Sequence, residues 1–253
     1  MRVLVLGGTT EAAALAKLLA GDRRFDATLS LAGRTSAPRP QPLATRVGGF
    51  GGVEGLAQWL REHETDAVVD ATHPYAARMS ANAVAACAQV GLPLGSIVRP
   101  AWQPLPDDDW QIVPTAEVAA AALGRTPRRV FLSLGRQDLH AFAAAPQHRY
   151  VARTIEPPQQ AVLPPNMRLL QARGPFDRDA EAKLLAGEDI DVVVSKNSGG
   201  GATYAKIEAA RELGLPVIMI ARPDKPAGHV LGSPGEAVMW LAHVRAPGSL
   251  RGV

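Results

Sequence analysis

The sequence predicts an α/β protein with two Rossmann-like lobes, each a parallel sheet flanked by helices, and an active-site cleft between the lobes. Three observations lead to this prediction. Short apolar runs alternate with alanine-rich helical patterns, the alternation is interrupted once by a proline- and aspartate-rich stretch, and it then resumes. Strand, helix, strand at this spacing is typical of parallel strands covered on both faces. The 253 residues, 47% of them hydrophobic, suffice for one large domain or for two small ones, each with its own core.

The first lobe is predicted over residues 1–100, where it would bind a nucleotide. Its strands are expected at 2–6, 27–31, 44–47, 67–70 and 95–98, and its helices near 11–19, 53–63 and 77–90. Residues 101–111 contain WQPLPDDDW, whose prolines and aspartates predict a linker.

The second lobe is predicted over residues 112–245, on the substrate side. Its strands are expected at 129–134, 150–154, 168–171, 191–194 and 217–221, and its helices near 178–186, 204–213 and 234–244. Residues 246–253 are expected to form a loose tail. The sequence leaves open whether the last helix packs on the second lobe or returns to the first.

Charge and cysteine content narrow the class of function. The net charge is +3 and the basic residues are scattered, which argues against nucleic acid and is compatible with an anionic small molecule. The single cysteine, Cys87, excludes an internal disulfide and a cysteine-based metal site. The N-terminus does not resemble a signal peptide and no stretch suits a membrane span, so we expect a cytoplasmic protein that is a monomer or a weak homo-oligomer.

The two lobes share a short, weak sequence repeat. GLPLGSIVRP at 91–100 and GLPVIMIARP at 214–223 match at several positions, and the same offset aligns Thr72-His73 with Ser195-Lys196. Two explanations of this repeat are open: duplication of an ancestral lobe, and the general preference of helix-to-strand turns for Gly and Pro. Because ligands of open parallel sheets bind beyond the carboxyl ends of the strands, polar residues at those ends are the candidate site.

A glycine-rich turn between the first strand and the first helix reads Gly7-Gly8-Thr9-Thr10-Glu11. It lacks the third glycine of the G-x-G-x-x-G fingerprint. Glycines nevertheless let backbone N–H groups approach a phosphate, and a helix N-terminus carries partial positive charge. We predict a phosphate site here; the alternative is an ordinary N-cap formed by Thr9 or Thr10.

The end of the second strand indicates which dinucleotide would bind. Domains that bind NAD place an acid there, on the ribose hydroxyls, whereas Arg and small hydroxyl residues favour NADP. Here the strand continues into Gly33, Arg34, Thr35 and Ser36, which suit a 2′-phosphate; the alternative is a solvated turn. In the glycine loop 48–52, Gly49 would let the cofactor lie close to the backbone.

The fourth strand ends in DATHPYA, which places Thr72, His73 and Tyr75 where the nicotinamide half of a dinucleotide is expected. Thr72 and His73 are therefore predicted to contact the cofactor as well as to line the reaction site. The alternatives are a structural His73 and a Pro74 that simply starts the next helix.

In the second lobe, the strand predicted at 191–194 continues into SKNSGGG. One cation, Lys196, and the backbone N–H groups of Asn197, Ser198 and Gly199 would converge where an acidic ligand binds. The alternative is a glycine-rich turn with no chemical role.

Six motifs together identify a family: GGTTE at 7–11, DATHPYA at 70–76, Arg99-Pro100, ARGPF at 172–176, SKNSGG at 195–200 and Arg222-Pro223. Their combination resembles the precorrin-6A reductase family of cobalamin biosynthesis. The resemblance extends from Val3 to about Val244, and DATHPYA and SKNSGG are its most specific parts.

The resemblance implies NADPH-dependent reduction of one double bond of precorrin-6A, giving precorrin-6B, without flavin or metal. The partner would be an anionic tetrapyrrole whose many carboxylates suit a basic cleft. Lys196 is the candidate cation that stabilises electron flow, and His73 or Tyr75 is the candidate proton donor. The residues expected to bind the substrate are Arg99, Arg173, Gly174, Lys196, Asn197, Ser198, Gly199 and Arg222.

Two other functions remain open on the sequence. A non-catalytic NADP-sensing module would need the glycine turn and the Arg-Thr-Ser pocket but not a second polar strand end. A two-lobed transferase that uses a nucleotide-linked donor is the other. Neither would oxidise NADPH.

Overall fold

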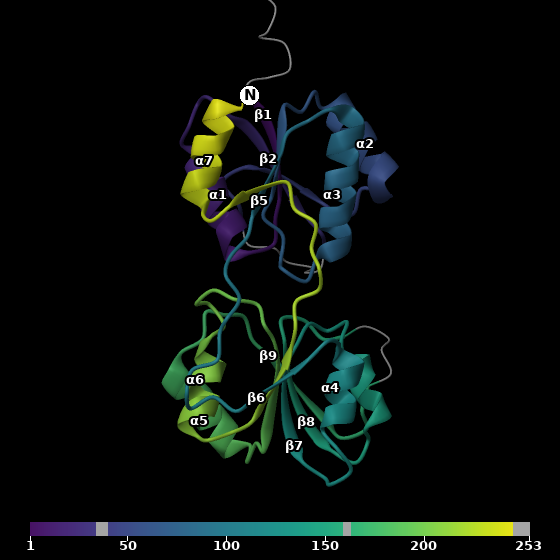
Figure 1. Ribbon diagram of the computed structural model, residues 1–253, viewed down its shortest axis with the longest axis vertical. Coiled ribbons are helices and arrows are strands. Elements are labelled where there is room, and N and C mark those ends of the chain that lie inside the picture. Colours follow the sequence, from purple (N-terminus) through teal and green to yellow (C-terminus); the bar gives the residue numbers. More distant parts are fainter. Residues whose placement is uncertain (34–39, 159–162, 245–253) are drawn as a thin grey trace, which may run out of the picture. The chain divides into compact units, whose positions relative to one another are not determined.

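The structure is a computed structural model that describes residues 1–33, 40–158 and 163–244. The chain divides into two compact units (Figure 1): unit 1 comprises Met1–Arg99 and Pro223–Val253, and unit 2 comprises Pro100–Arg222. Each unit contains a six-stranded sheet. All of its strand pairs are parallel, which confirms the predicted α/β class.

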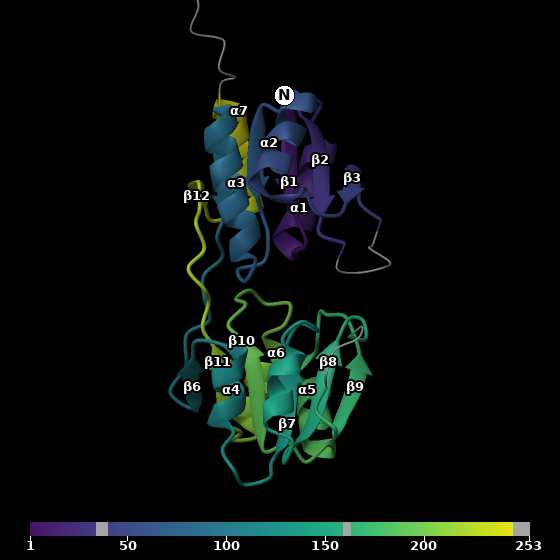
Figure 2. The same ribbon diagram turned by 90° about the vertical axis from the view of Figure 1, so that its right-hand side faces the viewer.

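The sheet of unit 1 has the strand order β12-β5-β4-β1-β2-β3. Its strands are β1 (Arg2–Leu6), β2 (Asp26–Leu31), β3 (Ala44–Val47), β4 (Ala67–Asp70), β5 (Leu94–Ile97) and β12 (His229–Leu231). Its helices are α1 (Thr10–Ala20), α2 (Gly52–Glu62), α3 (Ala77–Val90) and α7 (Pro234–His243). Figure 2 shows the edge formed by β2 and β3.

The core of unit 1 lies on both faces of its sheet because β1 is apolar from Val3 to Leu6 and β4 from Ala67 to Val69. Successive side chains of a strand point to opposite faces. Val3 and Val5 accordingly pack in the cluster that includes α1 and α7, whereas Leu4 and Leu6 pack in the cluster that includes α2 and α3. Both faces therefore need a helical layer, as the alternation of strands and helices predicted.

The C-terminal segment corrects the predicted domain boundary, which placed residues 112–245 together in the second lobe. β12 pairs with β5 in unit 1, with His229 opposite Gly95, and α7 packs against α1. The fit is close: a Cβ on Gly95 would lie 2.9 Å from the ring of Trp240. The prediction was wrong here because the apolar face of a helix does not specify which sheet it covers, and β12 is only three residues long.

The sheet of unit 2 has the strand order β6-β11-β10-β7-β8-β9. Its strands are β6 (Trp110–Val113), β7 (Arg129–Ser133), β8 (Arg149–Thr154), β9 (Met167–Gln171), β10 (Val192–Lys196) and β11 (Val217–Ile220). Its helices are α4 (Ala116–Ala122), α5 (Arg178–Gly187), α6 (Ala205–Glu212) and the 3₁₀ helix η1 (Leu139–Ala144). The prediction missed β6, α4 and η1.

The stretch predicted as a linker at 101–111 belongs instead to unit 2. Trp102 is buried in the core of this unit, and its indole N–H donates to the Gly200 carbonyl over 2.9 Å. Trp110 begins β6 and pairs with Val217 of β11. The prolines and aspartates suggested a solvated connection, but the two tryptophans supply apolar surface that unit 2 buries.

No helix in the described parts of the chain combines the length and the apolar character needed to cross a bilayer.

Candidate active site

The carboxyl ends of β1 and β4 are joined by Thr9. Its hydroxyl donates to the Ala71 carbonyl over 2.8 Å and accepts from the Ala12 N–H over 3.1 Å, so Thr9 is the N-cap of α1. The N-cap alternative is thereby confirmed for Thr9, and the predicted phosphate loop is tied to the start of the DATHPYA loop. The Thr10 hydroxyl donates to the Glu11 carboxylate over 3.1 Å.

The two glycines of this turn serve different purposes. A Cβ on Gly7 would lie 2.6 Å from Cδ1 of Leu29, so Gly7 lets the turn pack closely against the side chain of Leu29 on β2. Gly8 has φ +114°, and a Cβ there would meet no atom within 4 Å. Open space beside Gly8 and the N–H groups at the start of α1, which lack intrahelical acceptors, suit a phosphate of a dinucleotide.

Glu11 and Arg99 form an ion pair of 2.8 Å at the same edge of unit 1. Burial raises the pKa of Glu11, whereas the hydrogen bond from Arg99 and the positive charge of Arg99 lower it. The lowering effects are together the larger, so the pKa of this carboxyl lies below its usual value. Arg99 thus compensates an acid beside the glycine turn. The sequence assigned Arg99 to the substrate; the structure places it next to the residues predicted to bind the cofactor.

Asp70 explains why a buried strand ends in polar residues. Its carboxylate is fully buried and accepts from the Thr72 N–H over 2.9 Å and from the Thr72 hydroxyl over 2.6 Å. Ser80 donates to its other oxygen, and the Lys225 ammonium lies 3.5 Å from that oxygen. Lys225 also donates to the Thr72 carbonyl over 3.3 Å. The side chain of Thr72 is therefore held by Asp70, and sequence reasoning missed the contribution of Ser80 and Lys225.

His73 and Tyr75 lie side by side after this loop, with their ring centroids 5.6 Å apart. Nδ1 of His73 accepts from the Tyr75 N–H over 3.3 Å. In a neutral ring this bond assigns the proton to Nε2. Both residues are partly exposed.

The predicted 2′-phosphate residues Arg34, Thr35 and Ser36 lie outside the described residues. Gly33, which precedes them, has φ +69°, and a Cβ there would lie 3.7 Å from the Gly48 nitrogen. Beside Gly49, a Cβ would meet no atom within 4 Å. The carboxyl ends of β2 and β3 thus adjoin one another at the glycine loop.

In unit 2, Lys196 ends β10 and its ammonium donates to Oδ2 of Asp138 over 2.6 Å. Asp138 lies in the loop that follows β7, and β7 pairs with β10. Sequence reasoning missed Asp138, although the signal was present: GRQD follows the strand predicted at 129–134 as SKNS follows the strand predicted at 191–194. The pair holds one cation at the carboxyl edge of the sheet, and both side chains are partly exposed.

The rest of the SKNSGGG loop is held against the segment that enters unit 2. The Asn197 amide accepts from the Trp102 N–H over 2.8 Å and donates to the Trp102 carbonyl over 2.9 Å. Gly199 has φ +68°, and a Cβ there would lie 2.2 Å from the Pro100 carbonyl oxygen. The sequence predicted substrate contacts for Asn197 and Gly199; the structure shows that both shape the loop.

Arg222 also holds the backbone of this loop in place. Its guanidinium donates to the carbonyls of Asn197, Pro100 and Ser198 over 2.8, 3.0 and 3.1 Å. The Ser198 N–H donates to the Lys196 carbonyl over 2.8 Å. Arg222 therefore fixes the backbone around Ser198 and the first residue of unit 2.

The ARGPF loop meets the same region of unit 2. The Phe176 N–H donates to the Ala202 carbonyl over 3.3 Å, and a Cβ on Gly174 would lie 3.1 Å from that oxygen. The Phe176 ring stacks on the guanidinium of Arg153 at 3.6 Å. Arg173 is exposed at the tip of this loop. The structure thus places Arg173 and Gly174 on a loop that contacts the continuation of SKNSGGG.

A buried cluster of charges supports both loops. Arg153 and Glu181 form a two-pronged ion pair whose side chains are 6% and 4% exposed. Lys206 is buried beside them and donates to the Thr203 carbonyl over 2.6 Å, with its ammonium 4.9 Å from the Trp102 ring. Burial and the charge of Arg153 lower the pKa of Lys206 to about 7, against the opposing effect of Glu181.

Lys206 should make the stability of the protein depend on pH. The unfolded chain carries a proton on this lysine up to about pH 10.4, whereas the folded chain releases it above about pH 7. The free energy of unfolding is therefore expected to rise across that interval, by up to about 1.4 kcal/mol per pH unit from this group. Urea unfolding of the wild type and of Lys206→Met at several pH values measures the difference; parallel curves would contradict the expectation.

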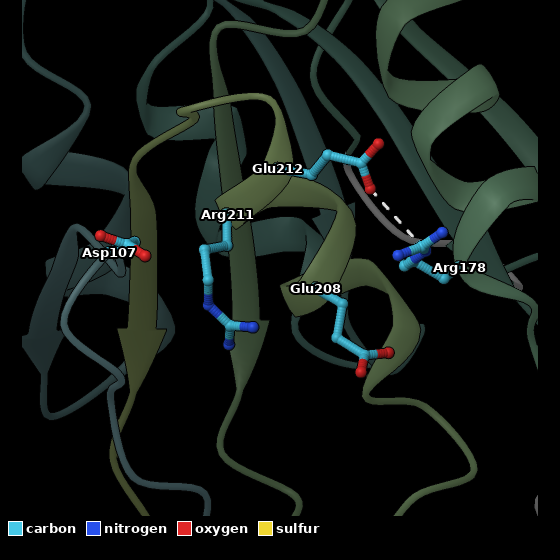
Figure 3. A pocket seen from close by; sticks show the side chains of 5 residues that line it. All are labelled: Asp107, Arg178, Glu208, Arg211 and Glu212. Carbon is cyan, nitrogen blue, oxygen red and sulfur yellow. Dashed lines mark ion pairs between the residues drawn. The ribbon is translucent and has the colours of Figure 1, made fainter.

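A pocket of about 430 Å³ lies on another part of unit 2 (Figure 3). Basic and acidic side chains line it together, and the Arg178 and Glu212 side chains are 3.7 Å apart. The five residues are Asp107, Arg178, Glu208, Arg211 and Glu212. None of them was predicted to be in the site, and their mixed charge does not favour an anionic ligand.

Comparison with known proteins agrees with the motifs. The family described as "Precorrin-6x reductase CbiJ/CobK" matches residues 2–242. The chain is 50% identical to "Precorrin-6A reductase" of Sinorhizobium sp. over 97% of this chain and 94% of that protein. It is 52% identical to the protein of the same name from Rhodobacter capsulatus, over 95% and 96% of the two chains.

A more distant relative and a solved structure complete the comparison. "Cobalt-precorrin-6A reductase" of Priestia megaterium is 32% identical over 95% of this chain and 98% of that protein. The solved structure "CobK precorrin-6A reductase" has a TM-score of 0.91 at 50% identity, over 100% of this chain and 99% of that chain. Since the match spans nearly every strand and helix of both units, the chain belongs to the precorrin-6x reductase family.

Proposed function

We propose that this protein reduces precorrin-6A to precorrin-6B in cobalamin biosynthesis, with NADPH as the hydride donor. The observation that carries the proposal is the identity of 50–52% to two proteins named precorrin-6A reductase over almost the entire chain. Three relatives named cobalt-precorrin-6A reductase are 28–32% identical. This difference favours the metal-free substrate, and cobalt-precorrin-6A is the second candidate.

Unit 1 would hold the cofactor. The pyrophosphate fits the open space beside Gly8 and the N-terminus of α1, which Thr9 caps. Arg34, with Thr35 and Ser36, would bind the 2′-phosphate, and Gly33 and Gly49 would allow the nucleotide to approach the backbone. When bound, NADPH supplies a hydride to the reacting double bond. The chain itself supplies orientation, charge and a proton.

Unit 2 would supply the charge. Lys196, which Asp138 holds at 2.6 Å, would stabilise the electron density that develops on the macrocycle. Arg173 and Ser198 would bind its carboxylates together with Lys196. Arg99, Asn197 and Arg222 contact neighbouring residues of the protein. These contacts favour a role in positioning other site residues over direct substrate binding. His73, with its Nε2 proton, or Tyr75 would donate the proton that completes the reduction.

The experiment that tests the proposal is anaerobic loss of NADPH absorbance when the purified protein is added to precorrin-6A. Oxidation is expected to depend on the tetrapyrrole and to be slower with NADH. A parallel reaction with cobalt-precorrin-6A decides between the two substrates. If NADPH binds but is not oxidised with either substrate, the proposal fails and an NADP-sensing module or a transferase takes its place.

Arg34→Ala provides a check on the cofactor. The KM for NADPH is expected to rise about 10-fold or more because a charge-assisted contact with the 2′-phosphate is lost. The KM for NADH, which lacks this phosphate, should stay nearly unchanged. An equal rise for both cofactors would remove Arg34 from 2′-phosphate binding.

A further inference from the structure

An arginine lies at the edge of the unit 1 sheet, beside the glycine loop 48–52. Arg46 belongs to β3 and stands opposite Ser30 of β2 in the parallel register. Its guanidinium donates to the Ser30 hydroxyl over 2.8 Å and to the carbonyls of Gly48 and Gly49 over 3.0 Å each. These bonds hold the positive charge at the carboxyl ends of β2 and β3, directly beside the glycine loop.

Aromatic packing fixes the plane of this guanidinium. It stacks on the ring of Phe50 at 3.7 Å, and Phe50 in turn makes an edge-to-face contact with Trp59, with centroids 5.7 Å apart. A stacked guanidinium loses little further freedom when it binds a planar or tetrahedral anion, because its orientation is already set.

The charge of Arg46 has no carboxylate partner among the residues that the structure describes. Arg46 is half-buried, and burial lowers its pKa. Two of its five N–H groups, on Nε and Nη2, have no acceptor in the described parts of the chain. A half-buried cation with unused donors is costly without an anion, so a bound anion would stabilise it.

The backbone around Arg46 leaves space for a ligand. Gly48 has φ +119°, and a Cβ on Gly48 or Gly49 would meet no atom within 4 Å. Any side chain at these two positions would enter that space. The loop thus exposes backbone beside a fixed guanidinium.

We propose that Arg46 binds the phosphate on the ribose of a nucleotide and thereby selects NADPH over NADH. This inference rests on the proposed function for the identity of the nucleotide. Arg46 would act through its fork of N–H groups, with the Phe50 ring as support. The free phosphorylated nucleotide 2′,5′-ADP carries the same recognition group and needs no tetrapyrrole.

Calorimetric binding of 2′,5′-ADP and 5′-ADP to the full-length protein tests the inference. The wild type is expected to bind 2′,5′-ADP more tightly. Arg46→Gln should weaken binding of 2′,5′-ADP about 10- to 100-fold, the loss expected for a charge-assisted contact. Binding of 5′-ADP should change less than about twofold. Arg61→Gln, on the exposed surface of α2, is the matched control and should change neither affinity.

Arg46→Lys tests whether binding needs only a positive charge or also the planar guanidinium group. It keeps the charge but loses the fork, so an intermediate affinity for 2′,5′-ADP is expected, and circular dichroism confirms that each variant is folded. If Arg46→Gln weakens both nucleotides equally, Arg46 only shapes the loop and the inference is overturned. Equal affinity of the wild type for both nucleotides overturns it as well. Binding of neither nucleotide, by contrast, would overturn the nucleotide part of the proposed function itself.

Discussion

Lys196→Ala is expected to lower kcat about 100- to 1,000-fold, while the Kd for NADPH changes less than about twofold. The physical reason is that a fixed cation at the edge of unit 2 stabilises charge that develops only during the reaction. Lys196 is suited to this because Asp138 holds its ammonium at 2.6 Å and both side chains are only partly exposed. Steady-state kinetics with precorrin-6A and separate titration of NADPH measure the two effects.

Three further variants test whether this effect belongs to Lys196. Lys183→Ala removes an exposed lysine on α5 and should leave kcat unchanged. Asp138→Asn keeps Lys196 but removes its counter-charge, so a smaller loss of kcat, about 10-fold, is expected. Lys196→Arg should restore part of the activity. An unchanged kcat in Lys196→Ala would remove this residue from the mechanism, and a matching loss of NADPH affinity would assign it to cofactor binding.

Glu181→Gln is expected to reduce the free energy of unfolding by about 3–5 kcal/mol. Glu181 is the acid between two buried basic groups, because it pairs with Arg153 and lies close to Lys206. Without its charge, the Arg153 guanidinium would remain buried beside Phe176 with no counter-ion. The ARGPF loop and the start of α6 should loosen with it, so hydrogen exchange is expected to rise in both.

The matched control is Glu212→Gln. Glu212 also faces an arginine, Arg178, but the two side chains are 53% and 57% exposed and 3.7 Å apart. Water screens such a pair, so the expected loss is about 1 kcal/mol or less. Denaturant unfolding of the two variants side by side gives the comparison. Similar losses of unfolding free energy in the two variants would show that the buried Arg153–Glu181 pair contributes no more to stability than an exposed pair.

Local patterns were sufficient to locate most of the secondary structure. The strands Arg2–Leu6, Ala44–Val47 and Ala67–Asp70 and the helix Ala77–Val90 were predicted with their observed bounds. Buried parallel strands are continuous apolar runs, and the alanine-rich helices between them have a clear period, so each element carries its own signal. β6 was missed because it overlaps the proline- and aspartate-rich stretch that predicted a linker, and β12 because it is only three residues long.

The part played by each polar residue was harder to predict. Thr72, Asn197 and Arg222 were assigned to ligands because they follow strand ends, yet their side chains bind Asp70, Trp102 and three carbonyls. Asp138 and Arg46 were missed although they lie at the same edges as predicted residues. A strand end predicts that polar groups gather, but not which of them contact one another.

The sequence by itself determined the α/β class, the glycine turn at 7–11 and the two polar strand ends, because these depend on residues close together in the chain. Only the tertiary structure decided that residues 223–244 return to the first sheet and that 101–111 belong to the second. It also decided that Lys225 meets Asp70 across more than 150 residues of chain. Such contacts are set by which apolar faces pack together and which buried charges find partners, and both are properties of the folded chain as a whole.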